Sequence, residues 1–123
     1  MPYNLSQIDK DALIRLRFSG ESSRRENEEA RSAVAELCEI TGYRRVIVDV
    51  TEAGAFMSGS TLDLFKFGTE FAMGQFPRKV KIAAVNENGP QRDIEFIVNV
   101  AHNRGFTIEL FNDVDEAWRW LQQ

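Results

Sequence analysis

The stretch that decides the fold is "RRVIVDV", residues 44–50, in which apolar residues follow one another until Asp49 interrupts them. An unbroken run of β-branched residues is typical of a strand that helices cover on both faces of a parallel sheet. Residues 79–85, "KVKIAAV", repeat the signal. The sequence therefore predicts an α/β fold built around a parallel sheet.

The chain before this run predicts an antiparallel hairpin. Residues 12–20, "ALIRLRFSG", alternate between apolar and polar side chains, which is the period of a strand. Residues 3–8 form a weaker strand, and Asp9-Lys10 between the two has the character of a turn. The alternating positions are Ala12, Ile14, Leu16 and Phe18 on one side, with Arg15 and Arg17 on the other.

In the rest of the chain, apolar residues also recur at helical spacing. Gly42 and Gly105 each follow such a segment, at the position where glycine favours a helix stop. Asp113 and Glu116 have capping-box spacing at the start of the last one. The predicted helices lie within residues 22–42, 62–73, 89–105 and 112–123.

The predicted order of elements is β-β-α-β-α-β-α-β-α, in which residues 107–111, "TIELF", supply the fifth strand. Strands that alternate with helices are joined by right-handed crossovers into a largely parallel sheet. We therefore expect a mostly parallel five-stranded sheet with an N-terminal antiparallel hairpin. No linker or repeat interrupts the chain, so residues 1–123 are expected to form a single domain.

Composition narrows the class of protein. The chain of 123 residues is 43% hydrophobic and 28% charged, as expected of a globular protein with a core of its own. A single cysteine, the lack of a signal-peptide pattern and the lack of a spanning apolar stretch predict a cytoplasmic protein that does not cross a membrane. The net charge of −4 argues against general nucleic-acid binding.

The residue types that carry catalysis are sparse. His102 is the one histidine and falls in the last turn of a predicted helix. Cys38 lies on an amphipathic helix, where a free cysteine is usually a small buried hydrophobe. Neither clustered metal ligands nor a phosphate-cradling glycine motif is present. The sequence therefore predicts no enzyme, no catalytic residue, no metal and no cofactor.

The start of the 62–73 helix is a candidate site. Ser58, Ser60 and Thr61 fall where this helix should begin, and Ser60 with Asp63 has capping-box spacing. The simpler interpretation is a capped helix. The alternative is an anion-binding or phosphorylated corner, because exposed amides at a helix start favour negative charge.

The same helix is apolar on two sides. One stripe suits the sheet, while Leu64, Phe67 and Phe71 form another on roughly the opposite side. Phe96 and Val100 similarly lie off the main apolar face of the next helix. The second stripe needs a further partner, and the neighbouring helix, a second subunit or partner protein, and a small apolar molecule all remain open.

The sequence resembles the STAS domains of the SpoIIAA-like family, which includes anti-sigma-factor antagonists, and is most similar to the small bacterial branch grouped as STAS/Sec14-like. The resemblance implies a SpoIIAA-like fold over nearly the whole chain. It rests chiefly on residues 100–121, "VAHNRGFTIELFNDVDEAWRWL". Shorter pieces that support it are "LIRLRFSG", "VIVDVT" and "KIAAV", residues 13–20, 46–51 and 81–85.

The resemblance also bears on the candidate serines. Antagonist members carry a phosphorylated serine in an Asp-Ser-Ser-Gly stretch at the start of the second helix. In an ungapped count, Ser58 takes the acidic position, Gly59 the phosphoserine position, Ser60 the second serine and Thr61 the glycine. The motif is degraded, although a shift of one residue would let Ser58 or Ser60 accept the phosphate.

Three hypotheses about function follow. The leading one is a non-catalytic STAS-like regulatory module that acts through protein–protein contacts, with a homodimer formed along the second stripe. The second is binding of a small apolar or acyl ligand by Leu64, Phe67, Phe71, Phe96 and Val100. The third is a phospho-switched anti-sigma-factor antagonist.

Overall fold

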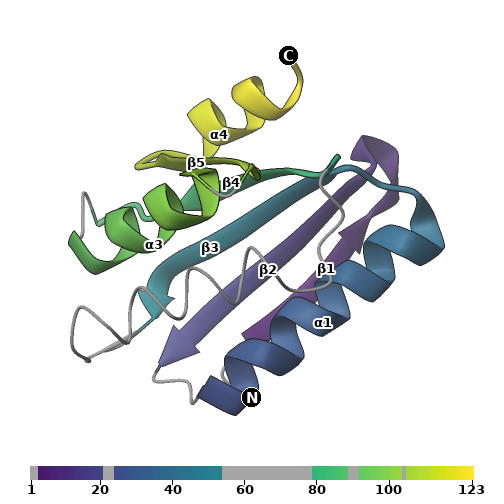
Figure 1. The fold of residues 1–123 in the computed structure, drawn as a ribbon. Helices are drawn as coiled ribbons and strands as arrows, with labels where there is room; N and C mark the ends of the chain where they lie inside the picture. Colours follow the sequence, from purple (N-terminus) through teal and green to yellow (C-terminus); the bar gives the residue numbers. More distant parts are fainter. Residues whose placement is uncertain (1–2, 21–23, 54–78, 89–91, 104) are drawn as a thin grey trace.

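The structure, a computed structural model, describes residues 3–20, 24–53, 79–88, 92–103 and 105–123. Within these ranges, strands and helices follow one another in the predicted order (Figure 1). The helix predicted over 62–73 lies outside the described residues. The elements are β1 Tyr3–Ile8, a 3-10 turn Asp9–Asp11, β2 Leu13–Gly20, α1 Arg24–Thr41, β3 Arg45–Ala53, β4 Lys81–Val85, α3 Arg92–Asn103, β5 Thr107–Phe111 and α4 Val114–Leu121.

The five strands form one sheet in the order β1-β2-β3-β4-β5. β1 pairs with β2 antiparallel, and every later pairing is parallel. The predicted mostly parallel sheet with an N-terminal hairpin is therefore confirmed. Within the described part of the chain, no helix is long and apolar enough to cross a membrane.

Helices cover both faces of the sheet (Figure 1). α1 and α3 pack on one face, which we call the α1/α3 face, and α4 packs on the other, the α4 face. Alternate residues of each strand point to opposite faces, so Val46 belongs to the first layer and Ile47 to the second. This explains why the run at 44–50 is apolar without alternation.

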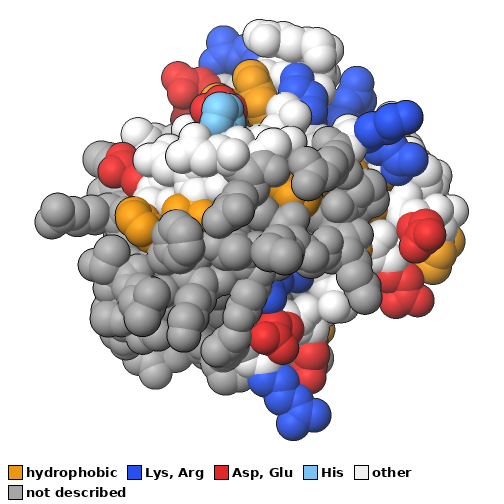
Figure 2. Space-filling view, in the orientation of Figure 1, with side chains coloured by type: hydrophobic (Ala, Val, Ile, Leu, Met, Phe, Trp, Pro, Cys, Tyr) orange, Lys and Arg blue, Asp and Glu red, His pale blue; other side chains and the backbone are white. Residues whose placement is uncertain are grey.

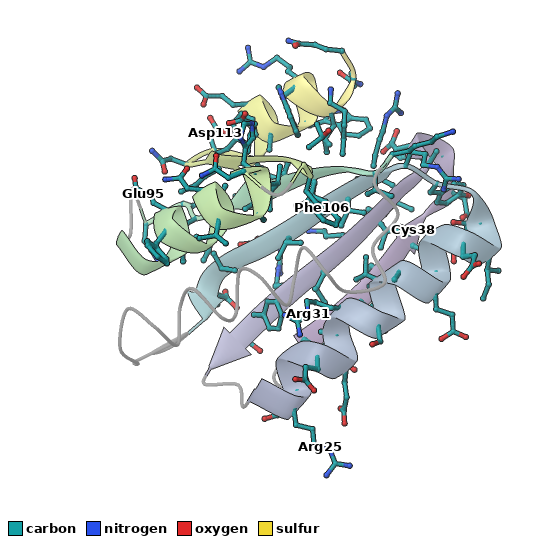
Figure 3. All side chains as sticks on the ribbon, in the orientation of Figure 1. Arg25, Arg31, Cys38, Glu95, Phe106 and Asp113 are labelled. Carbon is teal, nitrogen blue, oxygen red and sulfur yellow. The ribbon has the colours of Figure 1, made fainter. Side chains whose placement is uncertain are left out.

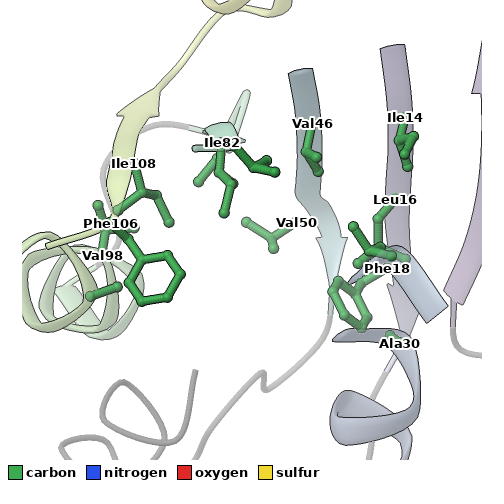
Figure 4. Close-up of a cluster of buried hydrophobic side chains, with 14 of the residues drawn as sticks. Ile14, Leu16, Phe18, Ala30, Val46, Val50, Ile82, Val98, Phe106 and Ile108 are labelled. Atoms are coloured by element: carbon green, nitrogen blue, oxygen red, sulfur yellow. The ribbon is translucent and has the colours of Figure 1, made fainter. Parts of the chain in front are cut away.

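The larger hydrophobic cluster lies on the α1/α3 face (Figure 4). Ile14, Val46 and Ile82 come from three adjacent strands and are fully buried. Ala30 and Val34 of α1 and Val98 of α3 close over them. Burial of branched side chains on this scale is the main source of stability, at roughly 1.5–3 kcal/mol for each large residue.

The hairpin turn differs in one detail from the sequence prediction. Ala12 was expected to begin β2, but its φ of 51° is left-handed and its N–H donates to Asp9 O at 3.2 Å. Ala12 therefore ends the turn, and the strand begins at Leu13. A left-handed alanine carries a steric cost that the closing of the hairpin has to offset.

The predicted helix ends agree with the structure more closely. Gly42 (φ 76°) and Gly105 (φ 98°) are both left-handed, as glycine helix stops require. Asp113 caps α4, as predicted, but its Oδ1 accepts from the backbone N–H of Asp115 at 2.7 Å rather than from that of Glu116. The cap thus satisfies the second amide of the helix instead of the third.

Candidate functional site

Most residues that the sequence analysis singled out fall in the segment 54–78, outside the described residues. Their proposed roles as phosphate acceptors, anion ligands or an apolar surface therefore stay predictions. These residues are Ser58, Ser60, Thr61, Leu64, Phe67 and Phe71.

The two remaining candidates, Phe96 and Val100, are one turn apart on α3. Both side chains are partly exposed, whereas Ile94, Val98 and Ala101 on the same helix are buried. On α3, Phe96 and Val100 thus form a partly exposed apolar edge beside the buried inner face, and their role in an interface or ligand site stays a prediction.

At the carboxyl end of β3, a network of hydrogen bonds joins this strand to the loop after β4. Asp49 Oδ1 accepts from the N–H of Thr51 at 2.9 Å. Thr51 Oγ1 accepts from the N–H of Glu87 at 3.0 Å, and Asn88 Nδ2 donates to Thr51 O at 2.8 Å. Asn86 Oδ1 in turn accepts from the N–H of Asn88 at 3.1 Å. We call Asp49, Thr51, Asn86 and Asn88 the carboxyl-edge network.

This network occupies the edge at which open α/β sheets usually bind ligands. The bonds of Thr51 and Asn88 join β3 to the loop after β4, whereas those of Asp49 and Asn86 are local, each to a backbone N–H two residues further on. Asp49 and Asn86 are 3% and 4% exposed, and a buried polar group of this kind is stabilising only when it is hydrogen-bonded. The hydrogen bonds therefore connect the carboxyl end of β3 to the loop that follows β4.

Asp49 also faces two arginines on the α4 face. Its Oδ2 lies 3.7 Å from Arg15 Nη2 and 3.7 Å from Arg17 Nε. The sequence contained part of this arrangement, because alternation placed both arginines on one side of a strand and Asp49 interrupted an apolar run. The contact itself depends on strand register, which puts Arg17 directly beside Asp49.

The two residues considered for catalysis lie apart. His102 Nε2 is 3.9 Å from Glu109 Oε1, with both side chains more than half exposed. Cys38 points from α1 towards the sheet (Figure 3), and burial raises the pKa of its thiol, an effect that nearby Arg44 only partly opposes. A raised pKa disfavours the reactive thiolate.

No cluster of potential metal ligands occurs in the described part of the chain. The depression between α3 and β5 has a volume of about 440 Å³ and a largely polar lining. The lining residues are Glu95, Val98, Asn99, Glu109, Leu110 and Asn112. Such a wall is unsuited to an acyl chain, which needs apolar contact along its length.

Comparison with known proteins identifies the family. The sequence model of the SpoIIAA-like family matches residues 13–122, so the chain belongs to the SpoIIAA-like family. This confirms the resemblance found in the sequence. No curated protein is detectably similar in sequence.

Two solved structures share the fold. One is the anti-sigma factor antagonist SpoIIAA in its unphosphorylated form, with a TM-score of 0.60 and 14% identity over 98% of this chain and 97% of that one. The other is a DUF3478-family protein with a SpoIIAA-like fold from Shewanella loihica PV-4, with a TM-score of 0.57 and 16% identity over 97% of this chain and 91% of that one. At these identities the likeness concerns the fold.

Proposed function

We propose that the protein is a non-catalytic regulatory module that acts through protein–protein contacts. The observation that carries the proposal is the carboxyl-edge network, because Thr51 and Asn88 are occupied in joining β3 to the loop after β4, and Asp49 is occupied by the N–H of Thr51 and by two arginines. A catalytic group has to be presented to a substrate with its reactive atom accessible. Membership of the SpoIIAA-like family is in keeping with a regulatory role.

We further propose that the module self-associates. The partly exposed pair Phe96 and Val100 on α3 supports this, since apolar side chains that remain partly exposed at neighbouring helical positions favour a partner surface. The predicted stripe of Leu64, Phe67 and Phe71 would extend the same interface. In this proposal the regulatory unit is a homodimer in the cytoplasm.

Sedimentation velocity across a concentration series tests self-association. The wild type should show a reversible dimer, and the F96S/V100S double variant should weaken it at least about tenfold, because central apolar anchors dominate binding energy. Ile40→Ser is the matched control, since Ile40 is an exposed apolar residue on α1 at 73% exposure. A wild type that stays monomeric at the highest soluble concentration would refute the dimer.

A second candidate is a phosphorylation-controlled antagonist. What favours it is the similarity in fold to an anti-sigma factor antagonist that is described in an unphosphorylated form. Ser58 and Ser60 are the proposed acceptors. Phosphopeptide mass spectrometry of protein isolated from its native cells should find phosphate on one of them, and S58A/S60A should abolish it. Persistent absence of phosphate from both serines would exclude this candidate.

A further inference from the structure

The register of the sheet gathers four cations on the α4 face. Arg15 and Arg17 come from β2, Arg45 from β3 and Lys81 from β4. Arg45 of β3 is the register partner of Lys81 on β4. On its other side, Arg45 is the register partner of Leu13 on β2, and Arg15 lies two residues further along β2. Residues two apart on a strand share a face about 6.6 Å apart. We call these four residues the basic shelf.

Two members of the shelf are held against indole rings of α4. Arg45 Cζ lies 5.6 Å from the ring centroid of Trp118, and Lys81 Nζ lies 4.5 Å from that of Trp120. Their hydrogen bonds go to carbonyl oxygens, from Arg45 to Asp11 O at 3.1 Å and from Lys81 to Trp120 O at 2.8 Å. An aromatic ring and a carbonyl orient a cation without cancelling its charge.

The other two members share one carboxylate. Arg15 and Arg17 both face Asp49 Oδ2, and their side chains remain 33% and 45% exposed. Within the described residues, Asp49 is the carboxylate that forms ion pairs with the shelf, while Glu109 on the same face pairs with His102. The shelf thus combines four cations with one ion-paired carboxylate, in a chain whose net charge is −4.

Two members of the shelf, Arg45 and Lys81, contact α4, and the other two lie on β2. α4 packs mainly against β4 and β5 (Figure 1), and the side chains of Arg15 and Arg17 on β2 stay partly exposed. There β1 adds the exposed polar residues Asn4 and Ser6, which are register neighbours of Arg17 and Arg15. Figure 2 shows Lys and Arg side chains gathered near the end of α4 and the turn between β1 and β2.

We propose that the basic shelf docks a short acidic segment of a partner protein. The inference rests on the proposed function, a module that works through protein contacts, and names the chemistry of the partner. Guanidinium groups fixed by Asp49 and by Trp118 present planar donors that suit carboxylates. Asn4 and Ser6 beside them suit the backbone of a peptide.

Charge at long range distinguishes a peptide from a larger polyanion. Charges further away than a Debye length, about 8 Å at physiological ionic strength, are largely screened. A short peptide on the shelf therefore meets chiefly the cations there, whereas a nucleic acid or an anionic membrane, which covers more surface, also meets acidic groups of a chain whose net charge is −4. The local excess of cations therefore favours a compact acidic segment.

Fluorescence anisotropy with a labelled decaglutamate peptide tests the proposal on the full chain. The R45Q/K81Q double variant keeps Asp49 paired with Arg15 and Arg17, and circular dichroism verifies that it is folded. We expect the peptide to bind the wild type in low salt, to bind this variant about tenfold more weakly, and to dissociate as salt rises. Arg25→Gln is the matched control, because Arg25 is an exposed cation on α1, and it should change the affinity less than twofold.

Each outcome decides the proposal. Loss of peptide affinity in R45Q/K81Q but not in R25Q supports it. Equal binding by wild type and R45Q/K81Q, no binding of decaglutamate by the wild type, or tighter binding of a dT10 oligonucleotide or of phosphatidylserine vesicles overturns it. The dimer test above uses F96S/V100S on α3, so failure of the shelf leaves the proposed function standing, and a monomeric wild type leaves the shelf standing.

Discussion

The two faces of the sheet are built from alternate residues of the same strands, yet they differ in the side chains that they carry. On the α1/α3 face, buried residues from β2 to β5 form one continuous cluster that includes Ile14, Val46 and Ile82. On the α4 face, the buried cluster around Ala83 and Leu121 gives way to the charged group around Asp49. One face is a complete apolar layer, and the other is apolar only beside α4.

This difference suggests that one face of the sheet serves mainly stability and the other is available for binding. Apolar burial is roughly proportional to area, so the α1/α3 face contributes most of the stability. The two arginines on the α4 face each contribute little, since ion pairs of partly exposed side chains are worth about 0–1 kcal/mol, whereas the buried Asp49 that they share contributes more. Side chains there are consequently free to be selected for binding.

The largest expected effect comes from opening the apolar face. Ile82→Ala removes a fully buried side chain from the centre of the α1/α3 cluster. Urea denaturation should show the free energy of unfolding reduced by about 3–4 kcal/mol, from lost transfer energy and the cavity left behind. Arg17→Ala on the opposite face is the control and should cost less than about 1 kcal/mol. Equal losses in both variants would contradict the proposed division between the faces.

An intermediate effect is expected at Asp49, which lies on the α4 face and belongs to the carboxyl-edge network. Asp49→Ala deprives the Thr51 N–H of its acceptor and two arginines of their counter-ion, which should lower the free energy of unfolding by about 2 kcal/mol. Asp49→Asn keeps the oxygen that Thr51 needs and should cost about half as much. Calorimetric melting of both variants measures the difference. An alanine variant as stable as wild type would show that the network does not brace β3.

The smallest expected effect lies at the hairpin turn. Hydrogen bonds, first from Gln7 and then from Tyr43, lower the pKa of Asp9 from its ordinary 3.8, and the same contact with Asp9 raises the pKa of Tyr43. The contact therefore stabilises the fold at pH values above the pKa of Asp9 in the unfolded chain. This stabilisation is lost as the pH falls through the lower pKa of Asp9 in the folded protein. At alkaline pH, the stabilisation is present below the ordinary pKa of tyrosine. It is lost as the pH rises through the higher pKa of Tyr43 in the folded protein.

NMR titration of the Asp9 carboxyl carbon measures this effect. Tyr43→Phe removes a donor that lies 2.7 Å from Asp9 Oδ1 and should move the pKa part of the way back towards 3.8. Gln7→Ala should move it further, because Gln7 is the larger cause. An unchanged pKa in both variants would mean that the exposed contact is not maintained in solution.

The sequence correctly predicted the features that depend on residues close together in the chain. Glycine stops at 42 and 105, the cap at Asp113 and the buried run at 44–50 depend on residues near in sequence, and the structure agrees with them. The left-handed Ala12 was missed because alanine carries no mark of a positive φ.

The rest depends on tertiary register. Arg45 against Trp118 and Lys81 against Trp120 bring together residues far apart in the chain, and no spacing rule links them. The carboxyl-edge network likewise requires β3 and β4 to be placed side by side before Thr51 can meet Glu87. The serines and the second apolar stripe of 58–71 lie outside the described residues, so those site predictions stay open to the experiments above.

The position of Cys38 gives the molecule a built-in chemical reporter. Its sulfur lies in the seam between α1 and the sheet, fully buried. An alkylating reagent can reach it only when that helix lifts away. The rate of alkylation would thus measure how often the contact between α1 and the sheet opens locally, with no label added and no residue changed.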